Sequence, residues 1–289
     1  MLSLPPRATW LWLVEAALAE DLGPGDATSL ALLGPGDRGA AVLEARAEIV
    51  VSGLELAREV FAQRGVECEL VASDGDLAEP KAPLARVRGA AQGILEAERT
   101  ALNFVQRLSG IATLTRRFCL EVRGTQAEIV DTRKTTPGFR TLEKYAVRCG
   151  GGRNHRIALY DGILIKDNHI AAVGSVGAAV ARAREHGSRH LRVRVEVESL
   201  AQAREALDAG ADALLVDNQP PAVIRAIVAE ARGRARVEAS GGVTLDSVGT
   251  IARTGVDEIS VGALTHSAAA LDLGLDLVST SDEPHEGKN

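Results

Sequence analysis

The feature that most constrains the fold is a series of short apolar runs in the second half of the chain, which alternate with stretches of helical composition. Each run is rich in β-branched residues and ends in a polar residue or a glycine, at intervals of 21 to 32 residues. The end residues are Lys134, Lys166, Glu196, Asp217, Ser240 and Gly262. Such runs are typical of buried parallel strands joined by helices. Because no dinucleotide-binding fingerprint accompanies them, the pattern favours a closed or nearly closed β/α barrel over an open doubly wound sheet.

The first part of the chain has a different pattern. Short strand-like segments occur between residues 40 and 98, with a helical stretch near 54–64, so a small α+β unit is the economical interpretation. A helix capped by Thr9 is predicted near the N-terminus, and residues 97–122 show the apolar spacing of a longer helix. Gly110 lies inside that longer helix, where a glycine often marks the close approach of another segment.

Composition places the chain among ordinary globular proteins and limits its partners. Of the 289 residues, 46% are hydrophobic and 25% are charged, which excludes a disordered or collagen-like chain. The net charge of −6 argues against a general nucleic-acid-binding surface. No apolar run reaches the ~20 residues of a membrane span, and the N-terminal stretch lacks a signal-peptide cleavage site. The three cysteines are widely spaced, so we expect no disulfide framework, no zinc site and a cytoplasmic location.

Positive charge is concentrated in one segment of this acidic chain, residues 131–170. Three of the five lysines lie there, together with five arginines and two histidines. Arg133, Lys134 and Lys166 follow apolar strands closely, where a charge must be paired or functional. An acidic protein that gathers cations at strand ends is expected to bind a multiply anionic ligand. For the other arginines of the segment, a solvated surface with salt bridges is the simpler interpretation.

Carboxylates and glycines end the later strands. Glu196 and Asp217 end two successive strands and would face the same barrel mouth, where they suit a divalent cation or the hydroxyl groups of a sugar. The alternative is that each pairs with a neighbouring cation. The last two strands run into EASGGV (238–243) and ISVGALTHS (259–267). Small residues there let backbone N–H groups approach a phosphate.

Together these motifs resemble those of the quinolinate phosphoribosyltransferase family. The resemblance begins with AEDLGPGDATS near the start, AERTALNFVQRLSGIAT at 97–113 and DTRKTTPGFRTLEKYAVRCGGGRNHR at 131–156. It continues through LIKDNHI, VEVES, LLVDN, EASGGV and ISVGALTHS. The matching segments extend over residues 20–275, and Ala158 stands where a glycine is commoner in the family.

The resemblance implies a fold and a reaction. The fold is α/β, with an N-terminal open α/β sandwich over residues 1–110, to which residues 272–289 return, and an incomplete (seven-stranded) α/β barrel over residues 111–271. The reaction transfers phosphoribose from 5-phosphoribosyl-1-pyrophosphate (PRPP) to quinolinate, with Mg²⁺. Its products are nicotinate mononucleotide, pyrophosphate and carbon dioxide, in NAD biosynthesis. A homodimer, or a larger assembly of dimers, is implied as well, in which each sandwich covers the other subunit's barrel mouth.

Roles for individual residues follow from the resemblance. Quinolinate carries two carboxylates, and forked arginine donors hold a carboxylate in a fixed plane. The residues implied for quinolinate are Arg133, His155, Arg156 and Lys166, with Arg99 of the partner subunit. Those implied for PRPP are Lys134, Lys166, Glu196 and Asp217, which are also the expected catalytic residues. The two carboxylates would serve the ribose hydroxyls and Mg²⁺. The remaining expected substrate-binding residues, most of them placed around the 5′-phosphate, are Thr132, Ser240, Gly241, Gly242, Gly262 and Ala263.

Alternatives to this interpretation remain open at the level of the sequence. A relative of the same fold could transfer phosphoribose to another acid, or serve metal transport. The RK pair at 133–134 together with NHR at 154–156 favours the dicarboxylate. A non-catalytic phosphate-binding barrel would have lost a strand-end carboxylate or lysine, and none is missing. Arg99, finally, could pair with Glu96 or Glu98 on its own helix instead of reaching a partner subunit.

Overall fold

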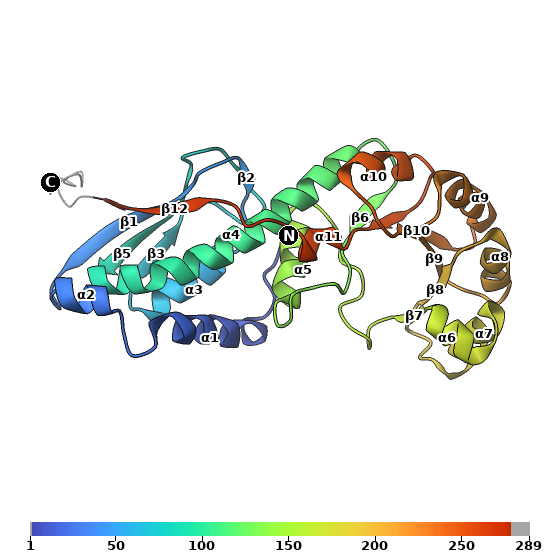
Figure 1. Cartoon of the computed structure of the whole chain (residues 1–289), viewed down its shortest axis with the longest axis horizontal. Coiled ribbons are helices and arrows are strands. Elements are labelled where there is room, and N and C mark those ends of the chain that lie inside the picture. Colours follow the sequence, from blue (N-terminus) through green and yellow to red (C-terminus); the bar gives the residue numbers. More distant parts are fainter. Residues whose placement is uncertain (1, 279–289) are drawn as a thin grey trace. The chain divides into compact units, whose positions relative to one another are not determined.

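The structure, a computed structural model, describes residues 2–278 and divides into two compact units (Figure 1). Within these residues, unit 1 comprises 2–114, 136–151 and 268–278, and unit 2 comprises Thr115–Thr135 and Gly152–Ser267. The chain therefore passes between the units four times. The expectation that residues 279–289 return to the first unit falls outside the described residues.

Unit 1 contains an antiparallel sheet with the strand order β12–β1–β5–β3. Its strands are β1 (Arg38–Ala45), β3 (Glu67–Leu70), β5 (Pro83–Ala90) and β12 (Leu273–Val278). A second, two-stranded ladder joins β2 (Ile49–Val50) to β4 (Leu77–Ala78). In the main sheet, Ala41 lies opposite Val87 and Leu43 opposite Ala85, and all four are buried. Because their neighbours Arg86 and Arg88 are exposed, the sheet has one apolar face.

Helices pack on the apolar face of this sheet (Figure 1). The helices of unit 1 are α1 (Leu11–Leu22), α2 (Ala27–Leu32), α3 (Leu54–Gln63), α5 (Arg140–Cys149) and most of α4 (Ala91–Glu121), after a short 3₁₀ turn at Arg7–Thr9. Helix α3 forms because its apolar residues fall on one side, where Leu56, Val60 and Phe61 are buried. The predicted cap at Thr9 is wrong: its hydroxyl donates to the carbonyl of Pro6 and closes the preceding turn.

Gly110 lies inside α4, where the sequence predicted a close approach. That prediction is confirmed, because a Cβ at this position would overlap the carbonyl oxygen of Ala269. Next to this contact, the backbone N–H of Leu271 donates to the carbonyl of Gln106 (3.2 Å). The missing side chain of Gly110 thus lets the segment that leads into β12 lie directly on α4.

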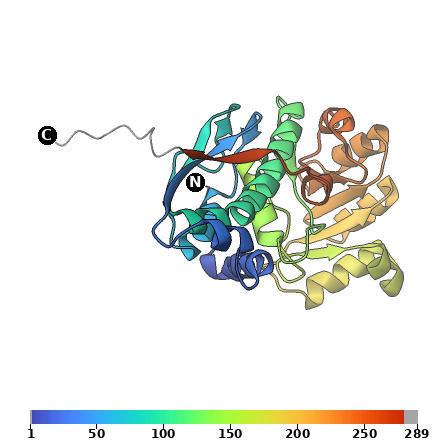
Figure 2. The same ribbon diagram turned by 60° about the vertical axis from the view of Figure 1, so that its left-hand side comes forward.

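Unit 2 is built on a parallel sheet with the strand order β6–β11–β10–β9–β8–β7. Its strands are β6 (Glu128–Val130), β7 (Ile163–Ile165), β8 (Val193–Val197), β9 (Ala213–Asp217), β10 (Arg236–Ser240) and β11 (Glu258–Ser260). Its helices, besides the end of α4, are α6 (Asp167–Val173), α7 (Val176–His186), α8 (Leu200–Asp208), α9 (Pro221–Ala231), α10 (Leu245–Ala252) and α11 (Ala263–His266). Helices α7 to α10 cover the outer face of the curved sheet (Figures 1 and 2). All six predicted runs are therefore strands of one sheet.

A seventh strand position is reduced to a single parallel bridge between Val130 and Arg153. On either side of it, Arg153 donates to the carbonyl of Ile129 (2.8 Å) and Asp131 donates to that of Arg153 (3.1 Å). No ladder joins this bridge to β7 among residues 2–278, so the ring of strands stays open there. The prediction of an incomplete α/β barrel is confirmed.

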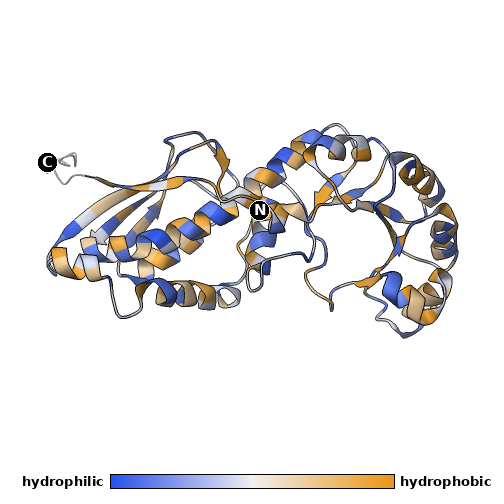
Figure 3. Ribbon diagram, viewed as in Figure 1, coloured by the Kyte–Doolittle hydropathy of each residue, from blue (hydrophilic) through white to orange (hydrophobic). Residues whose placement is uncertain are grey.

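Residues alternate along these strands between the helix-covered face and the interior of the barrel, and both hydrophobic and hydrophilic residues occur in the sheet of unit 2 (Figure 3). In β8, Val193, Val195 and Val197 are buried beneath the helices. Arg194 and Glu196 lie on the other face of the same strand and are partly accessible. Strand β8 therefore presents charged side chains to the barrel interior. Within the described part of the chain, no helix combines the length and apolar composition needed to cross a bilayer.

Candidate active site

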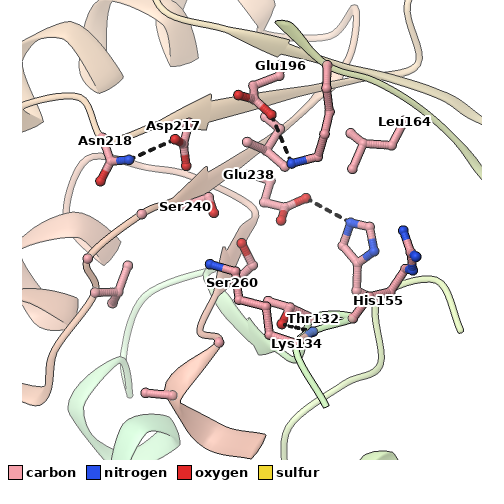
Figure 4. Close-up of a pocket in the computed structure, with 18 of the residues that line it drawn as sticks. Thr132, Lys134, His155, Leu164, Glu196, Asp217, Asn218, Glu238, Ser240 and Ser260 are labelled. Carbon is pink, nitrogen blue, oxygen red and sulfur yellow. Dashed lines mark hydrogen bonds and ion pairs between the residues drawn. The ribbon is translucent and has the colours of Figure 1, made fainter. Parts of the chain in front are cut away.

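A cavity of about 670 Å³ lies at the carboxyl ends of the unit 2 strands (Figure 4). Thirteen of the fourteen predicted substrate-binding residues line it. They are Thr132, Arg133, Lys134, His155, Arg156, Lys166, Glu196, Asp217, Ser240, Gly241, Gly242, Gly262 and Ala263. The volume is that of an ordinary small-molecule site. All of the lining residues belong to unit 2, so the fold of this unit alone brings them together.

One side of the cavity is strongly cationic, with Arg133 and Arg156 close together. Burial, reinforced by the nearby positive charges of Arg133 and Arg194, lowers the pKa of Arg156 from its ordinary value, and only Asp161 opposes this. The Arg156 guanidinium donates to the carbonyl of Gly162 (2.9 Å), which fixes its direction. An anion bound between these arginines would relieve their mutual repulsion.

The loop that carries His155 and Arg156 is held by a buried carboxylate. Asp131, directly after β6, is fully buried. Its Oδ1 accepts the backbone N–H of His155 (2.9 Å), and its Oδ2 accepts the side-chain amide of Asn154 (2.5 Å). Because both carboxylate oxygens accept hydrogen bonds from the same loop, the backbone that carries His155 and Arg156 is held in place.

Two carboxylates define the opposite side of the cavity. Glu196 near the end of β8 pairs with the Lys166 ammonium (3.4 Å), and Asp217 at the end of β9 accepts the side-chain amide of Asn218 (2.8 Å). No group of three or more potential metal-binding side chains occurs in the part of the chain that the structure describes. Two hard oxygen donors suit Mg²⁺ only where a substrate supplies further oxygens, which is the usual arrangement for this ion.

The third part of the cavity is lined by backbone. Gly241 and Gly242 follow β10 with φ values of 91° and 56°, a conformation that favours glycine. A Cβ at Gly241 would overlap the amide of Asn218. The side chain of Lys134 passes over Gly262, and its backbone carbonyl accepts the hydroxyl of Thr265 (2.6 Å). Small residues therefore leave room for a group that binds to backbone N–H donors.

Sequence reasoning missed several pocket residues, among them Asn218, Glu238, Ser260 and His266. Strand periodicity could have found two of them: Glu238 lies two positions before Ser240, and Ser260 lies two before Gly262, so each faces the same side as its strand-end residue. Asn218 is the first residue after β9 and has a positive φ of 51°. Its part in the site depends on this backbone conformation, for which the sequence offers only a weak signal.

Arg99 is the predicted site residue that the structure places outside this cavity, in the unit 1 part of α4. It is exposed, and no ion pair of Arg99 is found among residues 2–278. Glu96, one of its expected alternative partners, is buried and pairs instead with Arg64 and with the amide of Gln92.

Comparison with known proteins decides the family. A family model described as quinolinate phosphoribosyl transferase, N-terminal domain, matches residues 26–109, and the corresponding C-terminal domain model matches residues 111–276. The chain belongs to the quinolinate phosphoribosyltransferase family. The expectation drawn from the sequence motifs is confirmed.

Relatives of this family match over most of their length. The chain is 44% identical over 269 residues to the probable carboxylating nicotinate-nucleotide pyrophosphorylase of Bacillus subtilis. This match covers 92% of this chain and 93% of that protein. The chain is also 44% identical over 272 residues to the corresponding protein of Mycobacterium leprae, covering 91% and 95%. Among solved structures, the nicotinate-nucleotide pyrophosphorylase from Francisella tularensis superposes with a TM-score of 0.91 at 38% identity, covering 96% of this chain and 99% of that chain. NadC from Streptococcus pyogenes superposes with a TM-score of 0.92 at 37% identity and the same coverage.

Proposed function

We propose that this member of the family transfers phosphoribose from PRPP to quinolinate, with decarboxylation, to form nicotinate mononucleotide and pyrophosphate for NAD biosynthesis. The observation that carries the proposal is the arrangement of one cavity into three parts: paired arginines, paired carboxylates and a glycine-lined end. Quinolinate offers two carboxylates to the first part, and PRPP offers hydroxyls and phosphates to the other two.

Quinolinate binding is assigned to Arg133, His155, Arg156 and Lys166. Burial, together with the positive charges of Arg133 and Arg194, lowers the pKa of Arg156. A bound dianion offsets the repulsion between these cations, and a charge-assisted bond to a carboxylate contributes about 1.5–3 kcal/mol. The hydrogen bonds of Asp131 to the loop that carries His155 and Arg156 keep these donors in place before the substrate binds. Binding therefore needs little reorganisation of the cationic wall.

PRPP binding is assigned to Lys134, Lys166, Glu196, Asp217 and the glycine-lined end around Ser240, Gly241, Gly242, Gly262 and Ala263, with Thr132 beside them. Positive charge develops on the ribose as its bond to pyrophosphate breaks. Glu196 and Asp217 can stabilise this charge electrostatically, because both line the cavity at or next to the carboxyl ends of their strands. Backbone N–H groups at the glycine-lined end support the 5′-phosphate.

Mg²⁺ is part of this proposal. Glu196 and Asp217 would hold it together with oxygens of PRPP, in keeping with a donor set of two carboxylates. When bound, the ion neutralises charge on the departing pyrophosphate. Lys134, whose side chain lies over Gly262, adds a positive charge for the phosphates of PRPP.

Loss of carbon dioxide needs no covalent nucleophile from the protein. Once the ring nitrogen is ribosylated, its positive charge stabilises the electron pair that remains on C2 when carbon dioxide leaves, and C2 then takes up a proton from solvent to give nicotinate mononucleotide. The arginines that bind this carboxylate orient it, and exclusion of water from the cavity favours its loss.

A homodimer with shared sites completes the proposal, in which Arg99 of the partner subunit contacts quinolinate. Two observations support it. Arg99 is exposed without an ion pair within residues 2–278. The loop that follows Arg156 exposes Leu159 (71%) and Tyr160 (75%) next to the cavity residues, and exposed apolar side chains of this size are typical of interfaces. We also assign the enzyme to the cytoplasm, whose reducing conditions suit the three free cysteines.

The test is release of labelled carbon dioxide from quinolinate carrying the label in its 2-carboxylate. We expect release that depends on both PRPP and Mg²⁺ and that yields nicotinate mononucleotide. Nicotinate in place of quinolinate serves as the control acceptor. Formation of the mononucleotide from nicotinate, without any reaction of quinolinate, would contradict the proposal and assign the chain to another acid.

A further inference from the structure

Charged side chains of alternating sign form a nearly closed series in unit 2, from the exposed Arg153 to the buried Glu238, which we name the charge ring. Its members are Arg153, Glu128, Arg236, Glu258, Arg194, Glu238 and His155. Successive members pair at 2.8 to 3.4 Å, apart from the closer Arg194–Glu238 pair. The series begins and ends in one short segment, because Arg153 and His155 are two residues apart.

Glu238 is the member that links the charge ring to the cavity. It lies in β10, lines the cavity and is only 1% exposed. A buried carboxylate must be neutralised by nearby partners, and Glu238 has Arg194 on one side and His155 on the other. Since a carboxylate is a poor direct ligand for a dianion, the position of Glu238 beside the cationic wall points to a role through His155.

A backbone hydrogen bond indicates the tautomer of the neutral His155 ring. The backbone N–H of Arg156 donates to Nδ1 of the His155 ring (2.7 Å). A nitrogen that accepts a hydrogen bond carries no proton, so the proton of the neutral ring lies on Nε2. That nitrogen faces Oε2 of Glu238 at 3.4 Å (Figure 4). The backbone thus fixes Nδ1, whereas Nε2 lies at ion-pair distance from a carboxylate to which it donates no hydrogen bond.

We propose that Glu238 is a positioning residue, which holds the His155 ring in one orientation and in the Nε2–H tautomer, and that Arg194 in turn fixes Glu238. A negative charge beside one ring nitrogen favours the tautomer whose proton lies on that nitrogen, and carboxylates next to histidines at metal sites have the same effect. Only the kinetic consequence rests on the proposed function: a loose His155 weakens quinolinate binding and leaves the PRPP side of the cavity intact.

The first test needs no substrate. In the whole protein labelled with ¹⁵N-histidine, the His155 resonances are identified by their loss in His155→Gln. We expect one protonated nitrogen, Nε2, and one unprotonated nitrogen, Nδ1, with widely separated shifts. In Glu238→Ala the two shifts should converge as the tautomers mix. An Nδ1–H tautomer in the unmodified protein, or an unchanged spectrum in Glu238→Ala, overturns the proposal whatever reaction the enzyme catalyses.

The second test is kinetic. Glu238→Gln keeps the size of the side chain and removes its charge, so we expect the KM for quinolinate to rise about tenfold and the KM for PRPP to change less than twofold. Glu128→Gln is the matched control, because it makes the same change in the charge ring at a residue that does not line the cavity. It should lower the Tm and leave both KM values unchanged. Equal effects of the two variants on the KM for quinolinate would reduce Glu238 to a structural role and overturn the proposal.

Discussion

Arg133 and Arg156 form the cationic wall of the cavity, and they suit anion binding because neither forms an ion pair with a carboxylate within residues 2–278. Arg156 has a pKa lowered by burial and by neighbouring cations, so its charge is only partly compensated within the protein. Such a residue is suited to bind an anion, because ligand binding supplies the missing counter-charge.

Arg133→Ala and Arg156→Ala are each expected to weaken quinolinate binding by about 1.5–3 kcal/mol, the contribution of one charge-assisted bond. Isothermal titration with quinolinate measures the affinity directly. Arg204→Ala is the control, since Arg204 pairs with Glu230 on the helix-covered outside of the barrel. Unchanged affinity in both cavity variants would remove these arginines from the substrate site.

Glu196→Gln and Asp217→Asn should lower turnover far more than they weaken quinolinate binding. Their carboxylates face the side of the cavity assigned to ribose and Mg²⁺, where loss of a stabilising charge acts on the transition state. Steady-state kinetics at several Mg²⁺ concentrations would measure both effects. Normal turnover with a normal Mg²⁺ dependence, in either variant, would contradict its assigned role.

For single residues of the cavity, the sequence predicted mainly those that end strands. Lys166, Asp217 and Ser240 could be located because an apolar run ends at each of them. Asn218 escaped because its place depends on a positive φ. Strand periodicity places Glu238 on the cavity face, but its contact with Arg194 could not be predicted, because it joins two strands that are not adjacent in the sheet.

Helix α4 shows how one residue controls the packing of an element. Gly110→Ala should destabilise the protein by about 1–3 kcal/mol, because the added Cβ overlaps the carbonyl of Ala269. Helix propensity alone predicts the opposite sign, a gain of about 1 kcal/mol. Gly177→Ala in α7 is the matched control, since its nearest neighbour is the flexible side chain of Glu205. Chemical denaturation distinguishes the two, and a Gly110→Ala variant as stable as the parent would show that the segment at Ala269 is free to move.

The start of β8 is held by Asp212, which precedes β9. Partial burial raises the pKa of this carboxyl, but hydrogen bonds from Arg184 and from the N–H of Val193 outweigh it, so the net pKa lies below the ordinary value. A lowered pKa means that the stabilisation is present above the unfolded-state pKa and is lost as the pH falls through the folded-state pKa.

The stability difference between the parent and Asp212→Asn should therefore be largest near neutral pH and shrink below about pH 4. Thermal unfolding of both proteins between pH 3 and 7 measures it. Asp208→Asn, which removes an exposed partner of Arg234, controls for the general loss of an acidic group. A difference that is constant over this range would show that the charge of Asp212 is irrelevant.

The strands of unit 2 were predictable because each is a buried apolar run bounded by helical sequence. The seventh strand position was not, because a single bridge at Arg153 has no periodicity of its own. Thr9 illustrates a different limit: the sequence offered a plausible capping residue, but the turn from Pro6 to Trp10 uses its hydroxyl for another bond.

For the whole molecule, the main prediction concerns Arg99. If each site takes Arg99 from the partner subunit, then mixing the inactive variants Arg99→Ala and Lys134→Ala produces heterodimers with one doubly defective site and one intact site. Activity should partly return, to at most half of the parent value per heterodimer. Subunit exchange is verified by native mass spectrometry. Exchange without recovery would place Arg99 in its own subunit's site or in none.

The division into two units is another property that belongs to the whole chain. Residues 136–151 lie in unit 1 although they fall between two barrel strands in the sequence. Their helix, α5, has the length and composition of an ordinary helix between β6 and β7, so no local pattern separates it from the others. Only contacts between distant segments, such as the hydrogen bond from Tyr145 to Asp74, define its unit.

The pairing of β12 with β1 has a consequence for folding during synthesis on the ribosome. Strand β1 is complete at Ala45, but its neighbour starts only at Leu273. At about 5–20 residues per second, translation leaves that edge of the sheet unpaired for roughly 10 to 45 seconds. During this interval, newly made chains on one messenger carry the same open edge and can pair with each other. We therefore expect correct folding during synthesis to depend on chaperones that shield nascent chains, whereas the stability of the folded protein should not depend on them.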